Sequence, residues 1–210
     1  MSQQEVNKVA EKYELPLITS LIVKPNELDS VDESYYPLVV KGISKDVVHK
    51  SELNAVKLNI KTKEELHKAA EEISESFKSH NYEVEEYLVQ KFVKTKHEVL
   101  VGGFRDPSFG PMLMFGTGGK YVEVINDTSM KSAYLCEADI DDMINSTKMG
   151  ELLKGVRGEA PANLPSLKKI IKSAAMMMIE NKNIEEFDFN PLIIDEDGEI
   201  YAVDIRIKVN

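Results

Sequence analysis

The final part of the chain alternates between apolar and polar residues on either side of a short acidic turn, DEDG. This alternation predicts a β-hairpin, because successive side chains of a strand point to opposite faces. A two-residue turn would separate the apolar positions of the two strands, so we expect an odd-length loop with Gly198 in a left-handed or bulged conformation. In that register one face carries Phe187, Phe189, Ile193, Tyr201, Val203, Ile205 and Ile207.

The opposite face of the predicted hairpin is polar. It carries Asp188, Asn190, Asp204 and Arg206. Oxygen ligands beside an arginine suit a hard cation such as Mg²⁺ that is shared with phosphate oxygens. A polar face exposed to solvent fits the same spacing. Pro191 favours a site, because it holds Asn190 in an extended conformation and removes a hydrogen-bond donor from a strong strand.

The rest of the chain mixes amphipathic helices with short strands. Helical periodicity predicts helices at residues 5–15, 62–80, 137–145 and 165–180. Thr62 and Glu65 form a capping pattern, and Pro165 fits a first helical turn. Apolar runs predict strands at residues 17–23, 37–43, 56–60, 87–93, 99–104, 112–115 and 121–125, with a polar connection at 24–36. The methionines at 176–178 are interpreted as core filling.

Composition narrows the class of protein. With 210 residues, of which 42% are hydrophobic, the chain can bury one core or two small lobes. It has no apolar run of about 20 residues and no apolar leader at its start, so we expect neither a membrane span nor a signal peptide. The single cysteine, Cys136, favours the cytoplasm. The net charge of -10 disfavours a nucleic-acid binder, and an anionic ligand would need a local cationic pocket.

Phosphate chemistry is indicated by the segment VVKGISKDVVHKSE, which carries Lys41, Lys45, His49 and Lys50 between two predicted strands. A lysine at a strand end is placed to reach a phosphate as a point charge. His49 suits a phosphoryl acceptor, because an ordinary imidazole is largely neutral at pH 7 and Lys50 disfavours its protonated form. The alternative is a surface loop histidine. The other histidines are interpreted as surface residues: His67, His80 and His97.

A second candidate is the glycine-rich segment FGPMLMFGTGGKYVE. Its backbone N–H groups can approach an anion closely. The pattern alone is not specific, since it is neither a Walker loop nor a dinucleotide fingerprint. The chain also lacks the GxSxG and HExxH motifs, which removes the hydrolase-elbow and zincin interpretations.

Several short motifs, taken in order, resemble one family. They are HKSE, LVQ, RDPSFGPMLMFGTGG, VEV, LLKGVRGE, EFDFNPL and VDIRI. Together they resemble the ATP-grasp (β) subunit of ADP-forming acyl-CoA synthetases of the acetate–CoA ligase type, relatives of succinyl-CoA synthetase. The resemblance runs from about Glu5 to the C-terminus. It implies an α+β ATP-grasp fold in which two lobes clamp ATP and Mg²⁺, and we expect these lobes at residues 1–93 and 94–210.

The resemblance also implies a reaction. Acyl-CoA, phosphate and ADP interconvert with the free acid, CoA and ATP through an acyl phosphate and phosphohistidine intermediates. A CoA-binding α subunit makes the acyl phosphate and carries its own phosphorylated histidine, and the β subunit relays the phosphoryl group to ADP. We therefore expect an α2β2 complex.

The resemblance assigns roles to residues of this chain. His49 is the expected catalytic phosphoryl acceptor. The expected nucleotide-binding residues are Lys41, Lys50, Gln90, Glu98, Gly118, Gly119 and Lys131, and the expected metal ligands are Asp188, Asn190 and Asp204. The metal ligands agree with the polar hairpin face inferred from the alternation.

The chain departs from the family pattern at a few positions. Asn54 and Ala55 stand where the family usually has two glycines. Lys131 and Tyr134 stand where it commonly has arginine and proline, so the bidentate fork for phosphate is lost while the charge is kept. Two other functions stay open at this point: a nucleotide-binding regulatory subunit without catalysis, and an ATP-grasp ligase that activates a carboxylate directly.

Overall fold

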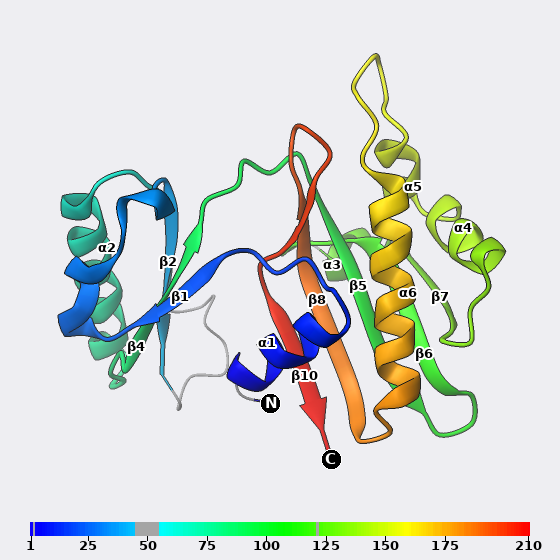
Figure 1. Ribbon diagram of the computed structural model, residues 1–210, viewed down its shortest axis with the longest axis horizontal. Coiled ribbons are helices and arrows are strands. Elements are labelled where there is room, and N and C mark those ends of the chain that lie inside the picture. Colours follow the sequence, from blue (N-terminus) through cyan, green and yellow to red (C-terminus); the bar gives the residue numbers. More distant parts are fainter. Residues whose placement is uncertain (2, 45–54, 121) are drawn as a thin grey trace. The chain divides into compact units, whose positions relative to one another are not determined.

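The computed structural model describes residues 1, 3–44, 55–120 and 122–210. They form two compact units, drawn in Figure 1: a small unit, Ile18–Val93, and a large unit, Met1–Leu17 with Lys94–Asn210. The first 17 residues were expected in the first lobe, with residues 18–93. In the structure they belong to the large unit. Val6 and Ala10 are buried in the core of the large unit, which draws the N-terminal helix to it.

The small unit is a four-stranded antiparallel sheet with one long helix on one face (Figure 1). Its strands, in the order β1-β4-β2-β3, are β1 (Ser20–Val23), β4 (Glu86–Lys91), β2 (Leu38–Ile43) and β3 (Val56–Ile60). The 3-10 helices η1 (Pro25–Ser30) and η2 (Glu33–Tyr35) form part of the connection between β1 and β2.

The helix α2 (Lys63–Ser79) forms where its capping pattern predicts. The Thr62 side chain accepts a hydrogen bond from the Glu65 N–H at 3.2 Å. The inner face of α2 packs against the sheet and buries Leu66, Ala69, Ala70, Ile73 and Phe77. The contact is close at Gly42, where a Cβ atom would lie 2.7 Å from Ile73 Cγ2.

The large unit contains a second antiparallel sheet, with strand order β10-β8-β5-β6-β7 and with β9 paired to β8. The strands are β5 (His97–Asp106), β6 (Gly110–Thr117), β7 (Thr128–Ser132), β8 (Ile184–Ile194), β9 (Ile200–Ala202) and β10 (Ile205–Val209). One face packs against α1 (Gln3–Lys12), α4 (Glu137–Asn145), α5 (Lys148–Leu153) and α6 (Leu164–Glu180) (Figure 1).

Two elements differ from the prediction. Residues 121–125 were expected to form a strand, but Val122–Ile125 forms the short helix α3, and the strand β7 follows it at Thr128–Ser132. The segment TSMKS was missed because β7 pairs on one side only, with β6, and so needs little apolar character. The six-residue helix α5 was also not predicted.

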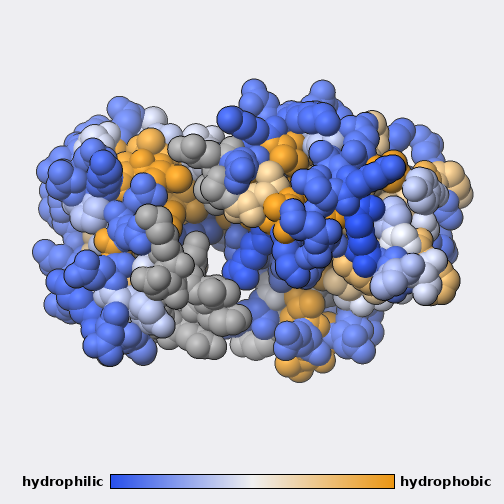
Figure 2. Space-filling view, turned by 90° about the horizontal axis from the view of Figure 1, so that it is seen from below, coloured by the Kyte–Doolittle hydropathy of each residue, from blue (hydrophilic) through white to orange (hydrophobic). Residues whose placement is uncertain are grey.

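The long helix α6 fills the core of the large unit as expected. The Asn163 side chain caps its start by accepting from the Ser166 N–H at 3.1 Å. Met177 and Met178 are fully buried, which confirms their interpretation as core residues, whereas Met176 is 46% exposed. Within the described part of the chain, none of the helices is both long and apolar enough to cross a membrane. The surface seen from below is largely hydrophilic with separate apolar patches (Figure 2).

Candidate nucleotide and metal site

The C-terminal hairpin has the predicted odd-length loop. Ile194 pairs with Ile200 across residues 195–199, and Gly198 has a φ of 85°. Further along, Phe189 pairs with Ile205, and Asp188 pairs with Arg206. This register places Asp188 and Arg206 on the face of the sheet opposite the helices, as the sequence predicts.

The prediction of which hairpin side chains are buried is wrong at one end of the hairpin. Ile193, Tyr201 and Val203 were expected in the core, but they are only partly buried. The buried residues at this end are instead Leu192, Ile194, Ile200 and Ala202.

The cause is a β-bulge at the middle of β8. The pairing of β8 with β5 shifts between Val99 and Val101, so that Asn190 and Pro191 together oppose Leu100. A bulge breaks the alternation of side chains and re-aims those near it. The Asn190–Pro191 peptide bond is cis. The bulge places Asn190 at the irregular point of an otherwise continuous strand.

The bulge brings Asn190 to the glycine-rich segment. The Gly119 N–H donates to Asn190 Oδ1 at 2.7 Å, and the Gly118 N–H donates to the Glu98 carbonyl oxygen at 2.8 Å. A Cβ on Gly119 would lie 1.9 Å from Glu98 Oε2, and one on Gly118 would lie 2.5 Å from the Val99 carbonyl carbon. Gly119 also has a φ of 81°, so both positions need glycine for the close approach.

Asp204 completes this group from the short connection between β9 and β10. The Asn190 N–H donates to the Asp204 carbonyl oxygen at 3.3 Å. The Asp204 carboxylate lies 3.4 Å from the Arg206 guanidinium and is 43% exposed. The large unit thus joins five of the predicted residues into one connected group: Glu98, Gly118, Gly119, Asn190 and Asp204.

The oxygen atoms of this group are suitable ligands for Mg²⁺. They are carboxylate and amide oxygens, which this cation prefers, and it normally keeps water and phosphate oxygens as its other ligands. Among the described residues, no three His, Cys, Asp or Glu side chains are placed to hold a metal by themselves. A cation held by Asn190 and Asp204 would therefore need ligands from phosphate, and when bound it would neutralise phosphate charge.

Asp188 differs electrostatically from Asp204. Burial raises the pKa of Asp188 from 3.8 to about 6, and the negative charge of Asp204 adds to the effect while Arg206 opposes it. A nearby cation would favour the ionised form of this carboxyl group. The ionised form of Asp188 is thus destabilised when no metal is bound.

This gives a stability prediction. A folded-state pKa of about 6 against 3.8 means that folding stability falls as pH rises through this interval, because the folded state holds the proton more tightly. Without divalent metal, we expect Asp188→Asn to stabilise the protein by about 2–3 kcal/mol at about pH 7.5, and by much less at about pH 4.5.

Urea denaturation at both pH values would measure this effect. Glu186→Gln is a matched control, because Glu186 is an exposed acid on the same strand. An equal gain for Asp188→Asn at both pH values, or none at the higher pH, would contradict the prediction.

In the small unit, Lys41 and Gln90 share one face of the sheet. Val39 pairs with Gln90 and Lys41 pairs with Leu88. The alternate residues Leu38 and Val40 face α2, so these four side chains lie on the opposite face. Val39, Leu88 and Gln90 are buried on this face and Lys41 is partly buried, so the lysine and the amide lie in apolar surroundings.

Lys131 does not join either group. It pairs with Leu113, whose side chain lies in the core under the helices, and its ammonium group forms a 2.5 Å ion pair with Asp142 of α4. It therefore lies on the face of the sheet opposite Asp188, where it is engaged by an acid. Lys45, His49, Lys50 and Asn54 fall at positions 45–54, outside the described residues.

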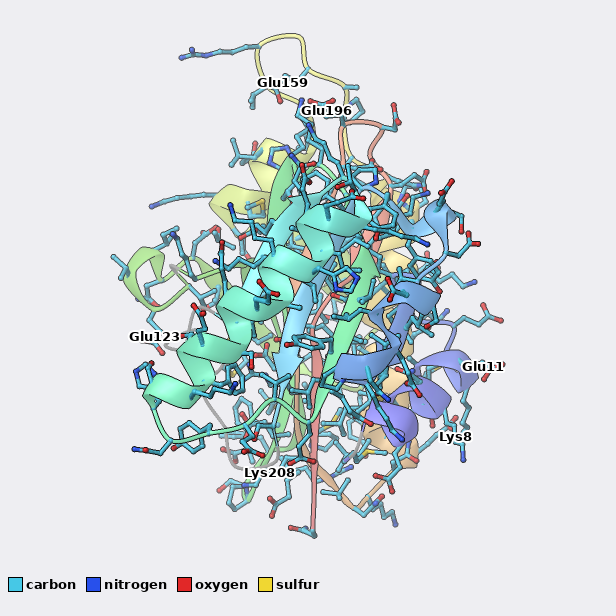
Figure 3. All side chains as sticks on the ribbon, turned by 90° about the vertical axis from the view of Figure 1, so that its left-hand side faces the viewer. Lys8, Glu11, Glu123, Glu159, Glu196 and Lys208 are labelled. Atoms are coloured by element: carbon cyan, nitrogen blue, oxygen red, sulfur yellow. The ribbon has the colours of Figure 1, made fainter. Side chains whose placement is uncertain are left out.

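His97 was interpreted as a surface residue, and it is in fact half-buried. With Lys96, Glu159 and Glu196 it lines a hollow at one end of the large unit, where the two glutamates are labelled in Figure 3. Burial lowers the pKa of His97, and the charge of Lys96 lowers it further. The acids here are paired, since Lys96 lies 3.3 Å from Glu159 and Lys94 lies 2.8 Å from Glu196.

Comparisons with known proteins identify the family of this chain. A family model described as an ATP-grasp domain matches residues 1–209. The chain is 34% identical, over 98% of its length, to the β subunit of acetate–CoA ligase [ADP-forming] I from Pyrococcus furiosus, and it covers 90% of that subunit. The chain belongs to this ATP-grasp family. The family resemblance found in the sequence motifs is therefore confirmed.

Some relatives of this ATP-grasp chain are much longer. It is 36% identical over 98% of its length to 4-hydroxybutyrate–CoA ligase [ADP-forming] from Nitrosopumilus maritimus, but covers only 30% of that protein. The chain thus spans most of one relative, which is named as a β subunit, and less than a third of another.

Solved structures confirm the α+β ATP-grasp fold. Acetyl-coenzyme A synthetase 1 of Ca. Korarchaeum cryptofilum, in complex with coenzyme A and Ca-AMPCP, matches with a TM-score of 0.87 and 36% identity, covering 99% of this chain and 92% of that one. A second structure of that enzyme, with Mg-AMPPCP, has a TM-score of 0.85 and 35% identity, covering 100% and 92%. In it the phosphohistidine segment points towards the nucleotide binding site. The expected Mg²⁺ and adenine nucleotide agree with these relatives.

Proposed function

We propose that this chain is the nucleotide-binding β subunit of an ADP-forming acyl-CoA synthetase, which relays a phosphoryl group between a partner subunit and ADP. One observation supports this most directly. Gly119 lies against Glu98 and donates its N–H to Asn190, and the Asn190 N–H donates to the backbone of Asp204, whose carboxylate is 43% exposed. Amide and carboxylate oxygens suit a magnesium ion that shares phosphate oxygens, and the two glycines allow those phosphates to approach the backbone closely.

The two units and the segment that carries His49 would have different roles in this reaction. In the large unit, Asn190 and Asp204 would hold Mg²⁺, and the backbone around Gly118 and Gly119 would approach the phosphates. In the small unit, Lys41 would add a positive charge and Gln90 a hydrogen bond. His49 would attack the incoming phosphoryl group with its neutral ring and then release the group to ADP.

A partner is part of this proposal. The chain covers 90% of the P. furiosus protein, which is named as a β subunit, and only 30% of the N. maritimus ligase, which supports a synthetase that needs more protein than this chain. The described residues form two units that are both accounted for by the ATP-grasp match. We expect a CoA-binding α subunit, and an α2β2 complex.

The test is reconstitution. The purified chain alone is expected to form no acyl-CoA from acetate, CoA and ATP, and to gain this activity when mixed with the α subunit of a related synthetase, because CoA binding needs a domain of its own. Mass spectrometry of the thioester measures the product, and the α subunit alone is the control. Acyl-CoA formed by the single purified chain would overturn the proposal that the reaction requires an α subunit.

A further inference from the structure

The loop between β6 and β7 is closed at its base by a buried acid. The Thr117 N–H donates to the Asp127 carbonyl oxygen at 3.0 Å, and the next pair of residues, Gly116 and Thr128, is in register. A Cβ on Gly116 would lie 2.1 Å from the Asp127 carbonyl oxygen, so the two strands meet closely here. Gly118, Gly119 and α3 all lie within this loop.

The side chain of Asp127 ties this base to helix α5. Its carboxylate accepts from the Thr117 hydroxyl at 2.8 Å, from the Lys148 N–H at 2.8 Å and from the Met149 N–H at 2.9 Å. We call Thr117, Asp127, Lys148 and Met149 the Asp127 cluster. Asp127 is only 9% exposed. Burial alone would raise the pKa of this carboxyl group, but the hydrogen bonds hold it below its ordinary 3.8, so the group is ionised at neutral pH.

Helix α5 does not depend on Asp127 alone. Thr147 caps the same helix by accepting from the Gly150 N–H at 3.0 Å, and its hydroxyl donates to the Ile144 carbonyl oxygen at 2.9 Å. A helix cap is therefore present without Asp127. The contact that Thr147 does not provide is the one to Thr117, at the end of β6.

The link to Thr117 matters because of the residues that follow it. Gly118 and Gly119 come next in the chain, and their N–H groups are aimed at Glu98 and Asn190. Glycine has the greatest backbone freedom of any residue, so the orientation of this pair depends on its two hydrogen bonds and on how firmly its neighbours are held. The Asp127 cluster fixes the residue immediately before the pair.

We propose that Asp127 is a positioning residue for the phosphate-binding backbone: by joining Thr117 to the first turn of α5, it holds Gly118 and Gly119 where they meet the nucleotide. This inference rests on the proposed nucleotide-binding function. Asp127 acts through Thr117 and not by contact with the ligand. Sequence reasoning missed it because no motif marks a lone aspartate in NDTS.

The test compares two threonines of nearly the same shape. Thr117→Val removes the link to the loop and leaves the backbone donors of Lys148 and Met149 on Asp127, while Thr147→Val removes the other cap of α5 and leaves the loop. We expect Thr117→Val and Asp127→Asn to weaken Mg-ADP binding about tenfold in calorimetry. Thr147→Val is expected to lower the melting temperature but to keep the wild-type affinity.

Amide hydrogen exchange gives a second measurement that needs no ligand. Peptides that contain Gly118 and Gly119 should exchange about tenfold faster in Thr117→Val than in wild type or Thr147→Val. Unchanged exchange and affinity in Thr117→Val, or an equal loss of affinity in Thr147→Val, would overturn the positioning role. Failure of the wild-type protein to bind Mg-ADP would instead overturn the proposed function, and the role in nucleotide binding with it.

Discussion

His49→Ala is expected to abolish overall turnover of the reconstituted synthetase while nucleotide binding persists. The loss should reach several orders of magnitude, which is the scale seen when a covalent nucleophile is deleted. The physical reason is that the substitution removes the proposed nucleophile. In the sequence, Lys45 and Lys50 are close to His49, and positive charges there would attract phosphate and disfavour ring protonation. The segment that carries it joins β2, which contains Lys41, to β3.

The measurement has two parts. The complete complex is given labelled ATP, and acid-labile, base-stable phosphate is followed on this chain in the wild type and in His49→Ala. His67→Ala is the matched control, because His67 lies exposed on α2, 2.9 Å from Asp29. Near-normal turnover of His49→Ala, or label that never reaches the chain, would favour an ATP-grasp ligase that activates the carboxylate directly.

Local patterns predicted much of the fold because their physical causes are local. The capped helix α2 and the terminal hairpin with its odd-length loop follow from residues within a few positions of one another. The bulge in β8 does not, because it depends on Leu100 of β5 as the opposing residue. Without that partner, the alternation was extended through Asn190, and Ile193 was assigned to the wrong face.

The segment VEVI shows a second limit. Two valines separated by a glutamate fit a strand, but Val124 is 82% exposed in the structure and the segment forms one helical turn. Period-two alternation over so few residues does not separate a strand from a turn of helix. The neighbouring strand β7 was missed for the opposite reason, since its polar residues carry little apolar signal.

The candidate site shows the same division. Asn190 and Asp204 were predicted to lie together because they belong to one hairpin, and in the structure a backbone hydrogen bond joins them. Lys131 was assigned by family position, whereas its side chain is directed by Asp142 of a helix that follows later in the chain. Asp127 was missed because its partners are contributed by β6 and α5. Contacts between distant segments therefore direct the Lys131 side chain and create the Asp127 cluster, and neither could be inferred from local sequence.

The second large effect concerns Mg²⁺. We expect adenine nucleotide to bind tightly only with Mg²⁺, and Asp204→Ala to lower the affinity for Mg-ADP by about 100-fold, about 2.7 kcal/mol. Asn190 already accepts a hydrogen bond from Gly119. Its backbone N–H donates to Asp204, whose carboxylate is 43% exposed. An octahedral ion needs more ligands than these two side chains supply, so metal and phosphate must complete each other's binding.

Calorimetry with and without Mg²⁺ measures this coupling. Asp197→Ala is the matched control, because it removes the same charge from an exposed position in the turn of the same hairpin. If long-range charge alone governed the affinity, the two variants would behave alike, whereas direct coordination affects only Asp204→Ala. Nucleotide affinity that is equal with and without Mg²⁺, or unchanged in Asp204→Ala, would show that the metal is not held by this hairpin.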